Sequence, residues 1–221
     1  MSVWAIVAAA GRGERLGLDR PKAFAPLGGR PLLAESLERL DASEWIDSIV
    51  VAAPPGWEEP SILLAEELGC SKVSACITGG STRAESVRLA LAEVAPQAAA
   101  VLVHDAARPL VPADVIERVL GALGEGWDGA VPALPIPDTV KRLDGDAVVE
   151  TLPREELVAV QTPQAFVADV LRRAAAGDVS GATDCEWLVA RAGGRVKAVP
   201  GDPKLRKITE PFDLELIESW L

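Results

Sequence analysis

Residues 5–22 read Ala-Ile-Val-Ala-Ala-Ala-Gly-Arg-Gly-Glu-Arg-Leu-Gly-Leu-Asp-Arg-Pro-Lys, an apolar segment followed by a glycine-rich stretch with several cations. They begin inside an apolar run, residues 3–10, which predicts a short buried β-strand. A loop with three glycines follows, and it carries the four cations Arg12, Arg15, Arg20 and Lys22. Small residues allow a ligand close to the backbone, and backbone N–H groups in such loops cradle phosphate oxygens. The stretch therefore predicts a strand followed by a phosphate-binding loop.

This loop departs from the two common phosphate-binding patterns. A Walker loop closes with Gly-Lys-Ser/Thr, which does not occur here. The dinucleotide pattern G-x-G-x-x-G is met only in part, because Leu16 stands where the third glycine belongs. The strand expected over residues 48–53 also ends without an acid for a ribose hydroxyl. The crowding of cations instead favours chemistry on a polyphosphate, and a glycine-rich turn with solvated arginines is the alternative.

Composition bounds the class of protein. The chain has 221 residues, 49% hydrophobic and 25% charged, which is typical of one globular domain over residues 1–221. No apolar run reaches the roughly 20 residues that span a bilayer, and no signal peptide pattern is present, so we expect a cytoplasmic protein without a membrane partner. The net charge of −11 argues against nucleic acid as a partner. The three cysteines lack metal-ligand spacing and are expected to be reduced.

Strand-like runs alternate with helical patterns along the chain. This alternation predicts an α/β fold, with a mostly parallel sheet covered by helices on both faces. The expected strands cover residues 3–10, 48–53, 73–77, 100–104, 129–134 and 196–199. The expected helices cover residues 31–40, 58–68, 82–94, 114–123, 165–176, 185–192 and 209–221.

The alternation is interrupted at residues 136–158. Residues 139–143 and 147–152 flank the turn Asp-Gly-Asp at 144–146, which predicts a β-hairpin. Two strands alone have little core, so the hairpin is expected to pack against something else. A second subunit is the first candidate, and the hairpin's own sheet is the alternative.

A second polar motif follows the expected third strand. Gly79 and Gly80 precede the hydroxyls of Ser81 and Thr82 at the start of a helix. Such a loop forms a polar lip for a ligand. The hydroxyls also suit a helix N-cap, with Glu85 completing a capping box. Ligand binding and capping are compatible, so both interpretations stay open.

A third motif stands where the expected fourth strand ends, at His104 and Asp105. Open parallel sheets bind ligands beyond the carboxyl ends of their strands. Asp105 is therefore a candidate magnesium ligand, because this ion takes one or two carboxylates plus phosphate oxygens. Arg108 is a candidate phosphate anchor, and an internal Asp105–Arg108 ion pair is the alternative. His104, the only histidine, is expected to be structural and is not assigned as a base.

Together these motifs resemble the 2-C-methyl-D-erythritol 4-phosphate cytidylyltransferase family of the non-mevalonate isoprenoid pathway. The matching segments run in family order along nearly the whole chain. They are Ala-Ala-Gly-x-Gly-x-Arg…Pro-Lys at 9–22, Gly-Gly-x-x-Arg-x-x-Ser-Val at 79–87, His-Asp-Ala-Ala-Arg-Pro at 104–109, Asp-Thr-x-Lys at 138–141, Gln-Thr-Pro-Gln-x-Phe at 161–166, Thr-Asp at 183–184 and Lys-Ile-Thr at 207–209.

The resemblance implies a nucleotidyltransferase-type, Rossmann-like fold and a homodimer built through the hairpin arm at 136–158. It implies the joining of CTP and 2-C-methyl-D-erythritol 4-phosphate to give 4-diphosphocytidyl-2-C-methyl-D-erythritol and pyrophosphate, with Mg2+. One departure is Leu205, where family members often carry asparagine, so the contact made at that position is open.

The resemblance also implies roles for individual residues. Arg15 and Lys22 look like the transition-state cations, and Lys207, with Arg154 from the other subunit's arm, would orient the acceptor phosphate. The CTP site would comprise Ala9, Ala10, Gly11, Gly80, Ser81, Ser86 and Ala106. The acceptor site would comprise Asp105, Arg108, Thr139, Thr162 and Thr183, with Asp105 also holding magnesium.

Three other functions stay open from the sequence. The first is a nucleotidyltransferase that moves another nucleotide, because the small loops suit several bases. The second is an NAD(P)-dependent oxidoreductase, which the missing third glycine and ribose acid disfavour. The third is a nucleotide-binding regulator without catalysis, which the joint presence of Arg15, Lys22, Asp105 and Lys207 disfavours.

Overall fold

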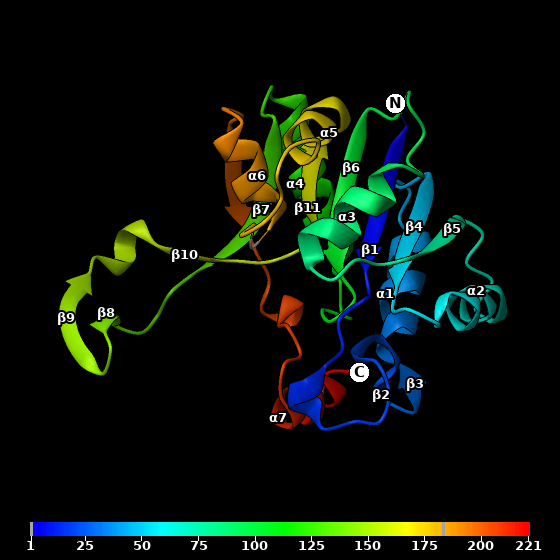
Figure 1. Ribbon diagram of the computed structural model, residues 1–221, viewed down its shortest axis with the longest axis horizontal. Helices are drawn as coiled ribbons and strands as arrows, with labels where there is room; N and C mark the ends of the chain where they lie inside the picture. Colours follow the sequence, from blue (N-terminus) through cyan, green and yellow to red (C-terminus); the bar gives the residue numbers. More distant parts are fainter. Residues whose placement is uncertain (1, 183) are drawn as a thin grey trace.

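The computed structural model describes residues 2–182 and 184–221, whose strands form a central sheet with helices on both faces (Figure 1). The order of this eight-stranded sheet is β10-β7-β11-β6-β1-β4-β5, and β12 also pairs with β7. The strands are β1 (Val3–Ala8), β4 (Ser48–Ala53), β5 (Val73–Thr78), β6 (Ala100–Asp105), β7 (Gly129–Pro135), β10 (Val158–Val160), β11 (Gln164–Val167) and β12 (Val196–Pro200). Four pairings are parallel, namely β1–β4, β1–β6, β4–β5 and β7–β12, and those of β10 and β11 are antiparallel. The predicted mostly parallel α/β sheet is confirmed.

Helices bury both faces of the sheet. The helices are α1 (Leu32–Asp41), α2 (Glu58–Glu67), α3 (Arg83–Leu91), α4 (Ala113–Gly124), α5 (Ala168–Ala175), α6 (Cys185–Arg191) and α7 (Pro211–Glu218). One core cluster joins α1, α2 and α4 to the sheet, and a second joins α3, α5 and α6 to the opposite face. Within β1, Ala5 and Val7 belong to the first cluster and Ile6 to the second. A strand buried on both faces explains the unbroken apolar run seen in the sequence.

The segment after β1 is folded against the C-terminal helix. A short ribbon, β2 (Pro26–Leu27) and β3 (Arg30–Pro31), follows the glycine-rich loop. Leu16 from that loop, Leu27 from the ribbon and Ile217 from α7 share a third buried cluster. The loop is therefore anchored by this buried cluster and lies near α7, as Figure 1 shows.

The hairpin is present and protrudes. β8 (Val140–Asp144) and β9 (Ala147–Leu152) form a separate two-stranded sheet joined by Gly145 and Asp146. Figure 1 shows this arm extending away from the body. Its apolar side chains Leu143 and Val148 are 60% and 62% exposed. The hairpin is therefore not packed on its own sheet, and its pairing with a second copy stays a prediction.

One expected helix was wrong in part. Residues 164–167 form β11, which lies between β6 and β7, and helix α5 begins only at Ala168. Ala165 and Phe166 are fully buried in this position, so pairing within the sheet outweighs the helical pattern. Strand β10 was not expected either, and β1 ends at Ala8 rather than at residue 10. Within the described ranges, no helix combines the length and apolarity that crossing a bilayer requires.

Candidate functional site

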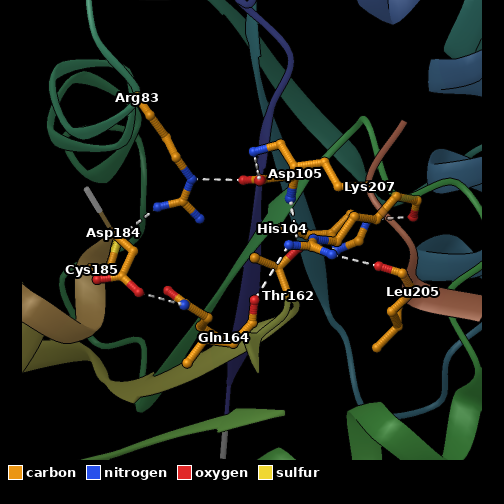
Figure 2. A network of polar contacts seen from close by, with 11 residues as sticks. Arg83, His104, Asp105, Thr162, Gln164, Asp184, Cys185, Leu205 and Lys207 are labelled. Atoms are coloured by element: carbon orange, nitrogen blue, oxygen red, sulfur yellow. Dashed lines mark hydrogen bonds and ion pairs between the residues drawn. The ribbon is translucent and has the colours of Figure 1, made fainter. Parts of the chain in front are cut away.

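A buried carboxylate at the end of β6 lies between two cations. Asp105 is 5% exposed. Its Oδ1 is 2.6 Å from Nε of Arg83, at the start of α3, and its Oδ2 is 2.7 Å from Nζ of Lys207, before α7 (Figure 2). The Asp105–Arg108 ion pair that the sequence left open is therefore replaced by two other partners, and the cluster keeps a net positive charge.

The environment of Asp105 keeps it ionised. Burial alone would raise its pKa, but the charges and hydrogen bonds of Arg83 and Lys207 outweigh burial and hold that pKa well below its usual range. The backbone N–H of Asp105 donates to Oγ1 of Thr162 at 3.0 Å. Thr162, expected at the acceptor site, thus lies directly beside Asp105.

His104 is fully buried and bonded at both ring nitrogens. Nε2 lies 3.1 Å from the carbonyl oxygen of Arg108, which only accepts, so Nε2 carries the proton. Nδ1 lies 3.1 Å from Oγ1 of Thr162 and accepts from that hydroxyl. Burial lowers the pKa of His104 to about 4. The side chain is therefore a neutral structural link, as the sequence predicts.

The single histidine permits a direct test. A pKa lowered from about 6.5 to about 4 means that the unfolded chain binds a proton between these values and the folded chain does not. The stability contributed by neutral His104 is then full above about pH 6.5 and is lost as the pH falls to about 4. We expect its imidazole NMR signals to stay at neutral-form shifts from pH 8 to about 5.5. A midpoint near 6.5 would contradict this assignment.

The two glycine loops meet beyond the carboxyl ends of β1 and β5. A Cβ added to Gly79 would lie 2.4 Å from Cβ of Ala10, so only glycine allows this approach. The hydroxyl of Ser86 accepts from the N–H of Gly80 at 3.0 Å and donates to the carbonyl of Thr82 at 2.9 Å. These contacts fix the second loop. They place four of the expected CTP residues where the two glycine loops meet, namely Ala10, Gly80, Ser81 and Ser86.

Helix capping and the Glu85 carboxylate account for the hydroxyls of Thr82 and Ser81 in the second loop. Thr82 is the N-cap of α3 and accepts from the N–H of Glu85 at 3.1 Å. The Glu85 carboxylate accepts from both N–H and hydroxyl of Ser81, each at 2.7 Å. The Ser81 side chain is thus held by Glu85 in this structure, and its expected contact with CTP stays a prediction.

Lys22 is the cation of the first loop whose pKa is shifted by its surroundings. It is half-buried, and burial together with the nearby charge of Lys207 lowers its pKa to about 8. A Cβ on Gly13 would lie 2.7 Å from Cβ of Lys22, so the loop closes tightly on this residue. Arg12 and Arg15 are exposed. The loop therefore brings one partly desolvated ammonium close to Lys207 and Asp105, while its guanidinium groups face solvent.

Arg108 binds backbone rather than a carboxylate. Its Nη1 donates to the carbonyl of Leu205 at 2.5 Å, and its Nη2 to that of Val160 at 3.4 Å. The Leu205 side chain is fully buried in the main core. At position 205, where the family resemblance leads one to expect asparagine, this chain therefore contacts Arg108 through its backbone carbonyl and packs its side chain in the core.

The remaining expected site residues lie apart from this cluster. Thr139 and Arg154 line one hollow on the arm, and Nη1 of Arg154 donates to the carbonyl of Pro137. Because the arm extends away from the body, they do not meet Asp105 within one chain. Thr183 lies outside the described residues.

Arg83 is a site residue that sequence reasoning missed. Besides Asp105, it contacts Sγ of Cys185 at 3.6 Å, and Gln164 donates to the neighbouring Asp184 at 3.2 Å (Figure 2). The sequence did place Arg83 directly after a Gly-Gly loop, at the start of an expected helix, and this position could have indicated that it belongs to the site.

Among the described residues no group of three His, Cys, Asp or Glu side chains could hold a metal alone, so an ion at Asp105 would need phosphate oxygens.

Comparisons with known proteins agree with this geometry. The profile described as "IspD: 2-C-methyl-D-erythritol 4-phosphate cytidylyltransferase" matches residues 3–221. A 2-C-methyl-D-erythritol 4-phosphate cytidylyltransferase from Nocardia farcinica is 49% identical over 221 residues, covering 100% of this chain and 94% of the relative. The crystal structure of the enzyme so named from Thermus thermophilus is 35% identical, with a TM-score of 0.78 and coverage of 100% and 98%. That from Francisella tularensis is 28% identical, with a TM-score of 0.84 and coverage of 100% of both chains.

The family match covers residues 3–221, and the solved structures of its members share the fold of this chain. The glycine loops, the end of β6 and the segment around Lys207 converge on one site, and the protruding hairpin follows β7. The chain belongs to the 2-C-methyl-D-erythritol 4-phosphate cytidylyltransferase family.

Proposed function

We propose that this chain transfers the cytidylyl group of CTP to 2-C-methyl-D-erythritol 4-phosphate, giving 4-diphosphocytidyl-2-C-methyl-D-erythritol and pyrophosphate, a step in the supply of isoprenoid precursors. The observation that carries the proposal is the meeting of Lys22, Asp105 and Lys207 beside two glycine loops. The whole chain, residues 1–221, acts as one domain with residues 136–158 as an arm, in the cytoplasm, without membrane or nucleic acid.

The reaction needs charge compensation more than proton transfer. The nucleophile is a phosphate monoester with a second pKa near 6, so it is mostly dianionic at neutral pH. Its oxygen attacks the α-phosphorus of CTP, and the bond to pyrophosphate breaks. No general base is required, and the buried neutral His104, already bonded on both sides, is consistent with a mechanism that has none.

Cations of the site would stabilise the charge that builds on the α-phosphate and pyrophosphate. At an effective dielectric of about 20, one unit charge 4 Å away contributes about 4 kcal/mol. Arg15 and Lys22 would supply this charge from the first loop. A polyphosphate beside Lys22 would raise its pKa again from about 8, so that it binds as an ammonium.

The nucleotide would lie across the two glycine loops, with backbone N–H groups approaching its phosphates. The CTP contacts are assigned to Ala9, Ala10, Gly11, Gly80, Ser81, Ser86 and Ala106. The acceptor would lie next to Asp105, with Arg108, Thr139, Thr162 and Thr183 as its other contacts and with Lys207 and Arg154 orienting its phosphate. Since Thr139 and Arg154 lie on the arm, they would reach this site from the second subunit of a homodimer.

Magnesium fits the donor set at Asp105. A carboxylate offers about four lone-pair positions, of which Arg83 and Lys207 use two. Asp105 would hold the ion together with phosphate oxygens, and the ion would neutralise charge on the triphosphate. The residues of the chain would still align the two substrates and keep the acceptor phosphate in line with the α-phosphorus.

Pyrophosphate release tests the proposal. The purified protein with magnesium should release pyrophosphate from CTP only when 2-C-methyl-D-erythritol 4-phosphate is present. A panel with ATP, GTP and UTP at equal concentration tests the choice of base. Release without the acceptor, or equal rates with another nucleotide, would contradict the proposed reaction.

A further inference from the structure

The segment that carries Lys207 has no regular secondary structure. Residues 206–210 lie between a short 3-10 turn (Pro203–Leu205) and α7, outside any ladder or helix. Yet the ammonium of Lys207 is held 2.7 Å from Asp105, although its side chain is 40% exposed. Ile208 anchors one point of this segment, because its side chain is fully buried and its N–H donates to the carbonyl of Ala107 at 2.9 Å. The residues on either side of Ile208 need further contacts to fix their direction.

Asp213, in the first turn of α7, binds the segment on both sides of Lys207. Its Oδ1 accepts from Nε of Arg206 at 2.7 Å. Its Oδ2 accepts from the N–H and the hydroxyl of Thr209, each at 2.8 Å, and from the N–H of Glu210 at 3.0 Å. One carboxylate thus receives four hydrogen bonds, and Lys207 lies within the loop that they close.

These contacts exceed what a helix cap requires. In the capping box of α7, the Glu210 side chain accepts from the backbone of Asp213 and the Asp213 side chain accepts from the backbone of Glu210. The bonds to Arg206 and Thr209 reach residues before the N-cap and do nothing for the helix itself. Asp213 is only 5% exposed, so its charge is desolvated as well as bonded.

The charge of Asp213 is strongly stabilised in place. Burial would raise the pKa of this carboxyl, but hydrogen bonds from Thr209, Arg206 and Glu210 outweigh burial and hold it well below its usual range. The helix N-terminus also favours a negative charge here.

We propose that Asp213 is a positioning residue, which holds the 206–209 segment so that Lys207 is aimed at the acceptor phosphate beside Asp105. The inference rests on the proposed function, because it assigns to Lys207 the orientation of that phosphate. Asp213 itself does not touch a substrate. Its removal should harm the alignment of the acceptor while leaving the binding of CTP largely intact.

Asp213→Asn tests this with little change in shape. The amide removes the charge and turns one acceptor oxygen into a donor that faces other donors. We expect kcat/KM for the acceptor to fall roughly 30-fold, as misplacement of a positioning group by a fraction of an ångström does. The KM for CTP should stay within about twofold.

Glu210→Ala is the matched control. It removes the other half of the same capping box but leaves the bonds from Arg206 and Thr209 to Asp213. It should lower the stability of α7 with kcat/KM nearly unchanged. Equal losses in the two variants would mean that only the helix cap matters and would overturn the inference.

A double-mutant cycle with Lys207→Ala separates positioning from a general structural effect. If Asp213 acts through Lys207, Asp213→Asn should cost almost nothing further in the Lys207→Ala background. Additive losses would contradict the inference. If Asp213→Asn does not fold, Thr209→Val serves in the same cycle, because it deletes one of the four hydrogen bonds that Asp213 accepts. An unmutated protein without turnover would instead refute the proposed function, so the two failures are distinguishable.

Discussion

Lys22→Ala is expected to lower kcat by about 100-fold or more, by analogy with the loss of one oxyanion-stabilising donor. The side chain is half-buried beside Lys207 and Asp105, where a charge is screened less than at the surface. Its contribution is therefore expected mainly in the transition state, so the KM values should change less than kcat. Steady-state kinetics with CTP and the acceptor measures this.

Arg20→Ala is the control for the charge of the loop as a whole. Arg20 belongs to the same loop, but it is 49% exposed and paired with Asp19 at 3.1 Å. Its removal should leave kcat within about twofold, since an exposed ion pair of this kind contributes little. Near-normal turnover of Lys22→Ala, or an equal loss in both variants, would refute the role assigned to Lys22.

Asp105→Asn is expected to destabilise the protein by about 3 kcal/mol and to abolish measurable turnover. The substitution leaves the largely buried guanidinium of Arg83 without its counter-charge. Removing one partner of a buried pair is costly because the other charge stays desolvated. For a chain of this length, the Tm should fall by about 10 °C. Calorimetry and urea unfolding measure this at neutral pH.

Asp114→Asn is the matched control for Asp105. Asp114 also has an arginine partner, Arg118, at 2.7 Å, but its side chain is 61% exposed. The loss should be under about 1 kcal/mol, because surface pairs are screened by water. A similar loss in both variants would show that burial does not govern the contribution of Asp105.

The fold could be predicted from the sequence wherever the local hydrophobic pattern and the tertiary environment favour the same element. The neighbouring parallel strands β1, β4, β5 and β6 are short runs that are each followed by a helix before the next strand of the sheet, so the mostly parallel sheet was predicted correctly. The ordered motifs predicted the family correctly. β11 was missed because Gln164 to Val167 continues into helix α5 without a turn signal. Only its place between β6 and β7 makes it a strand, and that place is decided by distant parts of the chain.

The candidate site was readable as motifs but not as contacts. Loops at the ends of neighbouring strands converge, which sheet topology alone predicts. The partners of Asp105 could not be predicted, because Arg83, Arg108 and Lys207 are all cations near one acid and only the folded backbone selects among them. The hydrogen bonds from Arg206 and Thr209 to Asp213 could not be predicted for a similar reason, since the sequence around Asp213 is also that of an ordinary helix cap.

A crystal structure with a non-hydrolysable CTP analogue and magnesium tests the central claim most directly. We expect Nζ of Lys22 and the guanidinium of Arg15 within about 3 Å of triphosphate oxygens, at charge-assisted hydrogen-bond distance. A bound triphosphate with both side chains turned to solvent, away from its oxygens, would contradict it.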